Sequence, residues 1–169
     1  MNGVASVRAL LTLTARYAGY GGAIFLMAMM LITVADVSLR TLFNLPITGA
    51  YDLVQLFLVG TVFLSIPDVF LNDENIVIDF VDHVFGRSAV GMLKIIANLA
   101  ALVFLAILSW RMIQPALDSL RFGETSPDLS IPMIVHWGLM IAGIVLALPA
   151  SAWILVESVR QLSPSRKVQ

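Results

Sequence analysis

Several kinds of chemistry are missing from this sequence. It has no cysteine, which excludes disulfides, thiolate metal sites and cysteine nucleophiles. Charged residues make up only 12% of the chain and the net charge is -1, so there is no electrostatic reason to expect nucleic acid as a partner. The two histidines, His83 and His136, are predicted at opposite membrane depths, so they cannot ligate one haem together. No metal cluster or nucleophile motif accompanies them, and the sequence therefore indicates no catalytic residue, metal or cofactor.

Hydrophobic residues are abundant instead. They form 59% of the 169 residues, and the mean hydropathy is +0.93, values that indicate an all-α integral membrane protein. The apolar segments predict one membrane domain, 1–169, with four transmembrane helices at 17–35, 49–71, 90–113 and 132–156. The first segment has 19 residues without a charge, which at ~1.5 Å per residue nearly fills a hydrocarbon core of ~30 Å.

Two further segments flank or separate the predicted spans. Residues 4–16 suit either a short helix at the membrane surface or a frayed tail. Residues 74–85 are too short and too acidic to cross, and their apolar positions can share one face, so they predict an amphipathic interfacial helix between spans two and three. Its acidic side chains, Asp79 among them, favour binding to protein over anionic lipid, whose charge would repel them.

The turn between the first two spans carries the most informative polar residues. Asp36 and Arg40 are four positions apart, so they lie on one helix face where they can pair. Asn44 and Gly49 are predicted to break the helix, and Asp52 to open the next one, where a carboxylate suits the positive end of the helix dipole. This combination favours an anchoring and docking device over a catalytic site.

The third span has its own landmarks. Lys94 and Arg111 lie near its two ends, with 16 uncharged residues between them, and both side chains are long enough to reach the interface. Asn98 lies one turn inside and is predicted to hydrogen-bond to a neighbouring helix. The helix is expected to continue beyond the membrane, with a bend at Pro115 and an end at Gly123.

The fourth span has a packing face of small residues. No Asp, Glu, Lys or Arg occurs between Leu129 and Val156. Within this run Gly143, Ala147 and Ser151 recur at spacing four, which predicts close helix packing within the membrane.

Charge asymmetry predicts the orientation. Four spans put both termini on one side, which together with the loop between spans two and three holds Arg8, Arg16, Arg87, Lys94, Arg160, Arg166 and Lys167. The other side holds Arg40, Arg111 and Arg121. Both termini are therefore predicted to be cytoplasmic, and the turn after Asp36 to face outwards.

Carrier chemistry is missing from the predicted spans. Carriers that couple ions to solutes usually keep acidic or broken-helix sites near mid-membrane, and here no carboxylate lies in the middle of a span. The chain is most simply a subunit of something larger. Two alternatives stay open: a stand-alone dimeric exporter, which would need a titratable acid in the membrane centre, and a membrane anchor of a redox enzyme that binds haem or quinone between helices.

Three sequence landmarks, in their order and spacing, resemble a known family. They are DVSLRTLFNLPITGAYDL at 36–53, NDENIVID at 72–79 and LSIPMIVHW at 129–137. The chain resembles the small membrane subunit, DctQ type, of tripartite ATP-independent periplasmic (TRAP) transporters. In that family an arginine precedes the turn and an acid opens span two, which correspond to Arg40 and Asp52. The second landmark departs from the family pattern, since Asn75 replaces a histidine.

The resemblance implies a complex of three proteins in the bacterial inner membrane and the periplasm. A periplasmic binding protein would deliver an organic acid, commonly a carboxylate, to a large membrane subunit of the DctM type, which moves it inwards with sodium ions. The small subunit would be a scaffold or stator for this symport, in contact with membrane lipids. The hypothetical partner contacts in this chain are Asp36, Arg40, Asp52, Asp79, Gly143, Ala147 and Ser151.

Overall fold

The chain folds into long helices. A computed structural model describes residues 2–72 and 87–162, with α1 at Asn2–Phe43, α2 at Ala50–Asn72, α4 at Arg87–Phe122 and α5 at Met133–Leu162. All four are long and apolar enough to cross a membrane, and the described residues contain no sheet, only an isolated bridge between Thr125 and Pro132. The prediction of an all-α protein with four apolar helices is confirmed. The predicted interfacial helix at 74–85, with Asp79, lies outside the described residues.

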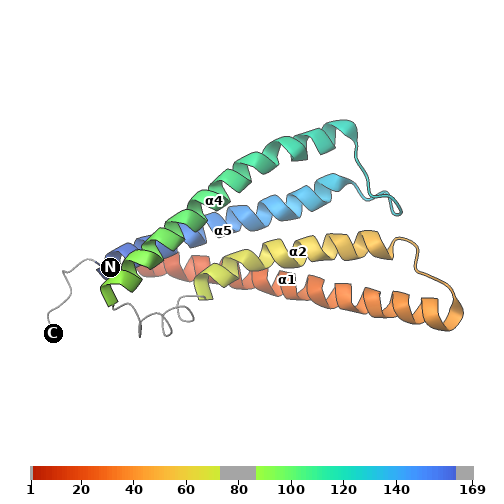
Figure 1. The fold of residues 1–169 in the computed structure, drawn as a ribbon, viewed down its shortest axis with the longest axis horizontal. Coiled ribbons are helices and arrows are strands. Elements are labelled where there is room, and N and C mark those ends of the chain that lie inside the picture. The colour runs from red at the N-terminus through yellow and green to blue at the C-terminus, as the bar shows by residue number, and fades with distance from the viewer. Residues whose placement is uncertain (1, 73–86, 163–169) are drawn as a thin grey trace.

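Two antiparallel hairpins make up the bundle. α1 packs along α2, α4 packs along α5, and the hairpins meet mainly where α2 contacts α5 (Figure 1). The first turn of α1 and the last turn of α5 lie at one end of the bundle. The turn 44–49 and the loop 123–132 lie at the other end, called the loop end below. The termini are thus on one side, as an even number of spans requires; the prediction that this side is cytoplasmic remains a prediction.

The N-terminal segment differs from its prediction. Residues 4–16 are neither a separate surface helix nor a frayed tail, because α1 runs without a break from Asn2 to Phe43. The segment 4–16 contains no proline or glycine, so nothing interrupts the hydrogen bonds of the helix before the apolar run begins.

Left-handed residues set the ends of the helices. Asn44 has φ 55° and its N–H donates to the Arg40 carbonyl at 3.1 Å, a left-handed cap on α1. Gly123 has φ 62° after α4, and the Glu124 N–H donates to the Ser119 carbonyl at 3.2 Å. The predicted breaks at Asn44 and Gly123 are confirmed. α4 continues through Pro115, as expected.

The core is centred on α5. Ile144 and Ala147 of α5 are fully buried and pack with Leu105 and Met112 of α4. On the other side, Gly143 lies against the backbone of α2 so closely that a Cβ there would collide with the Phe63 carbonyl oxygen. Small residues on α5 therefore let its backbone approach α2, as the spacing predicted.

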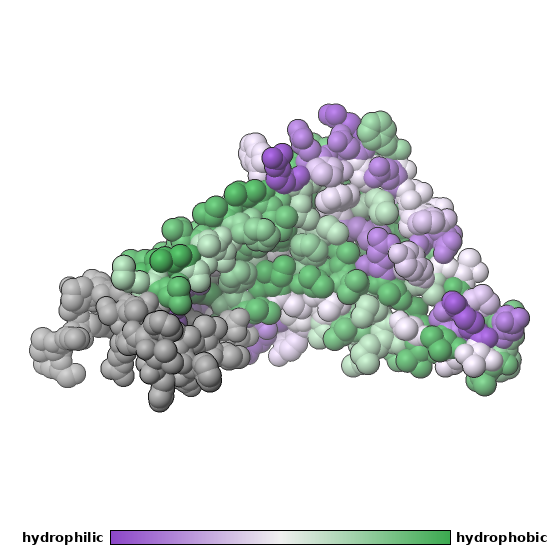
Figure 2. Space-filling model, in the orientation of Figure 1, coloured by the Kyte–Doolittle hydropathy of each residue, from purple (hydrophilic) through white to green (hydrophobic). Residues whose placement is uncertain are grey.

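Large apolar side chains remain uncovered on the outer helices. On α1 and α4 many are more than half exposed, among them Ile24, Leu31, Val34, Phe104 and Ile107. Figure 2 shows the polar residues gathered towards the loop end and apolar residues over the helices beside it. A surface of this kind needs lipid or another membrane protein to cover it.

Candidate functional site

Asp36 organises the turn between α1 and α2. Its Oδ2 accepts a hydrogen bond from Arg40 Nη2 at 2.8 Å, and its Oδ1 accepts one from the Ile47 backbone N–H, also at 2.8 Å. The Asp36 side chain is 12% exposed, whereas that of Arg40 is 63% exposed. The pair predicted from the spacing is present. The Asp36 carboxylate forms its hydrogen bonds within α1 and the turn, whereas the Arg40 guanidinium stays accessible at the surface.

Asp52 joins the two hairpins. Its Oδ2 accepts backbone hydrogen bonds from Asp128 at 3.0 Å and from Leu129 at 2.8 Å, so a residue in the first turn of α2 holds the loop that connects α4 to α5. Asp52 is completely buried. A carboxylate that accepts several N–H bonds is a strong acceptor, and here it adds a contact between helix and loop to the direct packing of α2 on α5.

A close contact beside Asp52 reinforces this junction. Gly49 has φ 81°, a conformation that favours glycine, and a Cβ at this position would collide with the Leu129 side chain. The glycine therefore lets the turn 44–49 lie directly on the loop 123–132. Predicting a break at Gly49 from the sequence was correct, but the loop residue that requires the glycine could not be foreseen.

The loop 123–132 is itself ordered. The Ser126 N–H donates to the Ile131 carbonyl at 2.9 Å, and the Ile131 N–H donates to the Ser126 hydroxyl at 3.1 Å. Ser130 has φ 53°, so the chain reverses in a left-handed residue between the two paired positions. Met133 then begins α5 with its N–H donating to the Glu124 carbonyl at 2.9 Å. The loop is a compact hairpin whose exposed residues lie in fixed positions.

Buried polar atoms lie behind this junction. His136, on α5, is 4% exposed. Both ring nitrogens of His136, and Oδ1 of Asp52, have no hydrogen-bond partner among the described residues. His136 was predicted to be an interfacial residue near the outer end of span four, and its position in the first turn of α5 agrees with that depth.

The small residues predicted to form a packing face on span four, and Asn98, make their contacts within this chain. Gly143, Ala147 and Ser151 are buried, and the Ser151 hydroxyl donates to the Leu148 carbonyl at 2.9 Å. Asn98 Nδ2 donates to Ser158 Oγ at 3.0 Å, which confirms the predicted hydrogen bond between helices. The Asn98–Ser158 bond joins α4 to α5, whereas the Ser151 bond lies within α5.

The site is therefore the loop end as a surface, formed by the turn 44–49, the loop 123–132 and Arg40. The structure brings Asp36 and Arg40 together, and it places Asp52 beneath the loop. Sequence reasoning missed Asp128 and Leu129, whose contacts with Asp52 and Gly49 connect the two hairpins. The turn-forming residues of 124–132 do indicate a loop in the sequence. They do not indicate which helix that loop packs on.

The described residues contain no group of three or more His, Cys, Asp or Glu side chains that could hold a metal ion. The loop end is an ordered surface beside the accessible Arg40, on a bundle whose outer helices are uncovered and long and apolar enough to cross a membrane, and this defines a membrane protein.

Comparison with known families identifies the class. Residues 29–162 match the family model described as "Tripartite ATP-independent periplasmic transporters, DctQ component". Because the match covers most of the chain and includes the turn, the loop and α5, this protein belongs to the DctQ family, the small-subunit family of TRAP transporters. Searches of curated proteins and of solved structures gave no significant match.

Proposed function

We propose that this chain is the small permease subunit of a sodium-coupled TRAP transporter that imports an organic acid, most simply a carboxylate. The observation that carries the proposal is the family match over 29–162, which makes a TRAP small subunit the class of the protein. In the proposed complex, a periplasmic binding protein delivers the substrate and a large DctM-type membrane subunit moves it across the bacterial inner membrane.

The proposed role is that of a scaffold against which the large subunit moves. Two carboxylates are buried in the described part of the chain, Asp36 and Asp52. Both lie at the loop end and accept hydrogen bonds from backbone N–H groups of this chain, so they serve its own structure. This supports a subunit that holds position over one that carries an ion or a solute.

The uncovered faces of α1 and α4 are the proposed contact with the large subunit. α4 packs on α5, and α1 packs mainly on α2, so each outer helix keeps a broad apolar side. Gly143, Ala147 and Ser151 are turned towards the chain's own helices, and we propose that they support this association indirectly by keeping α5 close to α2.

The loop end is the proposed contact with the binding protein. With both termini in the cytoplasm, as the charge distribution predicts, the turn 44–49 and the loop 123–132 face the periplasm. Arg40 is an accessible cation beside the exposed acids Glu124 and Asp128, while Asp36 and Asp52 shape the surface from beneath. Asp79 is proposed to contact a partner on the cytoplasmic side.

Purification tests the proposal directly. The tagged chain is extracted in a mild detergent from the cells that naturally express it, and co-purifying proteins are identified by mass spectrometry. We expect a polytopic protein of about twice this length or more, which would be the large subunit. Recovery of this chain only with copies of itself would favour the exporter alternative, and a haem spectrum would favour the redox anchor.

A further inference from the structure

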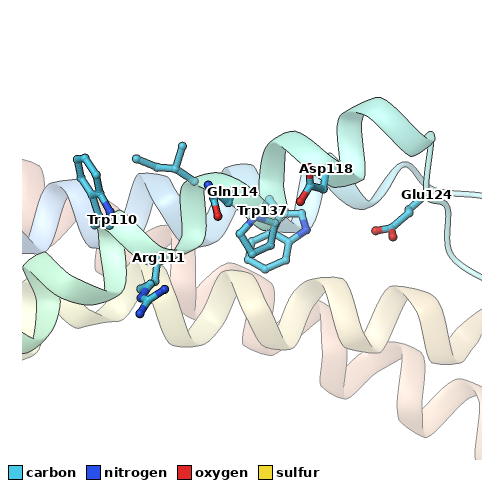
Figure 3. A pocket seen from close by; sticks show the side chains of 8 residues that line it. Trp110, Arg111, Gln114, Asp118, Glu124 and Trp137 are labelled. Carbon is cyan, nitrogen blue, oxygen red and sulfur yellow. The ribbon is translucent and has the colours of Figure 1, made fainter.

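A charged cleft lies between α4 and α5 near the loop end. Its volume is about 800 Å³, and its lining combines two tryptophans with charged and polar side chains (Figure 3). The lining residues that carry the inference are Trp110, Arg111, Gln114, Asp118, Glu124 and Trp137. No residue of the junction around Asp52 lines the cleft, which shares only Glu124 with the loop 123–132 of the site described above.

The polar residues of the cleft form a stripe along α4. Arg111 and Asp118 are seven residues apart, two helical turns, and each immediately precedes a buried residue, Met112 and Ser119. The stripe therefore runs along the edge of the α4 face that packs on α5. Glu124 extends it past the end of α4, so a positive group lies deeper in the bundle and two negative groups lie nearer the loop end (Figure 3).

The charges of the cleft have no partners within the chain. Among the described residues, Arg111, Asp118 and Glu124 form no ion pair, and their side chains make no hydrogen bond, although all three line one cleft. Two helical turns correspond to about 10 Å, which separates Arg111 from Asp118 too far for a direct pair. An occupant with an anion and a cation a few ångströms apart would satisfy both.

The depth of the cleft points to the headgroup region of the membrane. The 16 uncharged residues between Lys94 and Arg111 span about 24 Å, which is close to the thickness of the hydrocarbon core. With Lys94 at one boundary of this core, Arg111 lies at the opposite boundary. Trp110 and Trp137 fit an aromatic belt at the same level. Phosphate groups of lipids are concentrated at this depth, and the exposed Phe104 and Ile107 continue the α4 surface towards the bilayer centre.

We propose that this cleft binds the headgroup of a zwitterionic phospholipid with a primary ammonium group, of the phosphatidylethanolamine class. Arg111 would bind the phosphate, because a guanidinium forms paired hydrogen bonds with phosphate oxygens. Asp118 and Glu124 would accept hydrogen bonds from the ammonium group, which a choline headgroup cannot donate. An anionic lipid without an ammonium group would face two carboxylates with one arginine. The proposal requires that the chain spans a membrane and is independent of which transporter it serves.

Native mass spectrometry of the full-length chain tests this, alone and with its large subunit if one co-purifies. The detergent-solubilised protein is titrated with a phosphatidylethanolamine, a phosphatidylcholine and a phosphatidylglycerol of identical acyl chains, and with diacylglycerol. We expect the phosphatidylethanolamine to bind most tightly. Arg111→Gln should weaken its binding by about tenfold, the loss expected for a charge-assisted hydrogen bond. Asp118→Asn should reduce the preference over phosphatidylglycerol.

Controls separate the cleft from general lipid binding. Arg121→Gln removes an exposed arginine of α4 that does not line the cleft, and it should leave all affinities unchanged. Circular dichroism and thermal unfolding of each variant check that the fold is intact. Free glycerophosphoethanolamine should not displace the lipid, because it lacks the acyl chains.

Equal binding of phosphatidylethanolamine by wild type and Arg111→Gln would overturn the proposal. So would an Arg111→Gln variant that loses the large subunit while its lipid binding is unchanged, since Arg111 would then pair with a protein carboxylate.

Discussion

Asp52 and Leu129 are 77 residues apart in the sequence, and the carboxylate of the first accepts the backbone N–H of the second at 2.8 Å. This bond and the one from the Asp128 N–H link the start of α2 to the loop between α4 and α5, so they connect the two helical hairpins at the loop end. Asp52 therefore fixes the loop 123–132 on the turn 44–49, and the two segments together form one surface.

The first prediction concerns this bond. Asp52→Ala should release the backbone of Asp128 and Leu129, so that their amides exchange with deuterium about tenfold faster or more, while the amides in the middle of α5 stay protected. Hydrogen–deuterium exchange with peptide-level mass spectrometry measures this. Asp128→Asn is the matched control, because it changes an exposed side chain of the same loop and leaves the backbone hydrogen bond in place. Unchanged exchange in Asp52→Ala would show that the loop is held by other contacts.

The second prediction separates the two members of the turn pair. Arg40→Ala removes an exposed guanidinium and should change the stability of the isolated chain by no more than about 0.5 kcal/mol. If Arg40 contacts the binding protein, the same variant should weaken docking by about tenfold. Thermal unfolding and binding-protein titration measure the two effects. Arg121→Ala provides an exposed arginine at the end of α4 as a control. Wild-type uptake by Arg40→Ala at normal complex levels would contradict a contact role.

The third prediction concerns Asp36, which acts within the chain. Asp36→Ala removes the acceptors of both the Ile47 N–H and the Arg40 guanidinium, so the turn 44–49 should become more mobile even though Arg40 is still present. Limited proteolysis at the turn should be faster in Asp36→Ala than in Arg40→Ala. The opposite order would mean that the arginine, and not the carboxylate, holds the turn.

The fourth prediction tests the close approach of α5 and α2. Gly143→Ala would direct a methyl group at the Phe63 carbonyl oxygen, and overpacking of this kind should destabilise the bundle by about 2 kcal/mol. Gly138→Ala is the matched control five positions earlier on the same helix, where a Cβ meets no atom within 4 Å, and it should be close to neutral. Thermal unfolding in detergent compares the two. Equal stabilities would mean that α5 and α2 are farther apart than the structure places them.

Much of the fold could be predicted because it depends on local patterns. Long apolar segments identified four helices, and Asn44 and Gly123 identified ends of helices, since left-handed caps depend on a few neighbouring residues. The spacing of Asp36 and Arg40 gave their ion pair for the same reason. The prediction for residues 4–16 was wrong, because an apolar face opposite Arg8 and Arg16 suits a separate surface helix but does not by itself end a helix, and α1 continues through this segment.

The contacts between hairpins could not be predicted. Asp52 was identified as the acid that opens span two, a role set by its own helix. Its two hydrogen bonds to the loop depend on how α2 and α5 pack, and that packing depends in turn on which helix faces Gly143. The charged cleft could not be predicted either, because Trp137 of α5 lies beside the polar stripe of α4 only in the folded bundle.

Reconstitution into sodium-free liposomes tests the central claim, that this chain is a non-carrying subunit of a larger transporter. Uptake of a radiolabelled organic acid is driven by an inward sodium gradient, in vesicles that contain this chain alone, the large subunit alone, or both, with the binding protein added outside. Accumulation is predicted only where this chain and the large subunit are both present. Accumulation by liposomes that contain this chain alone would contradict the account.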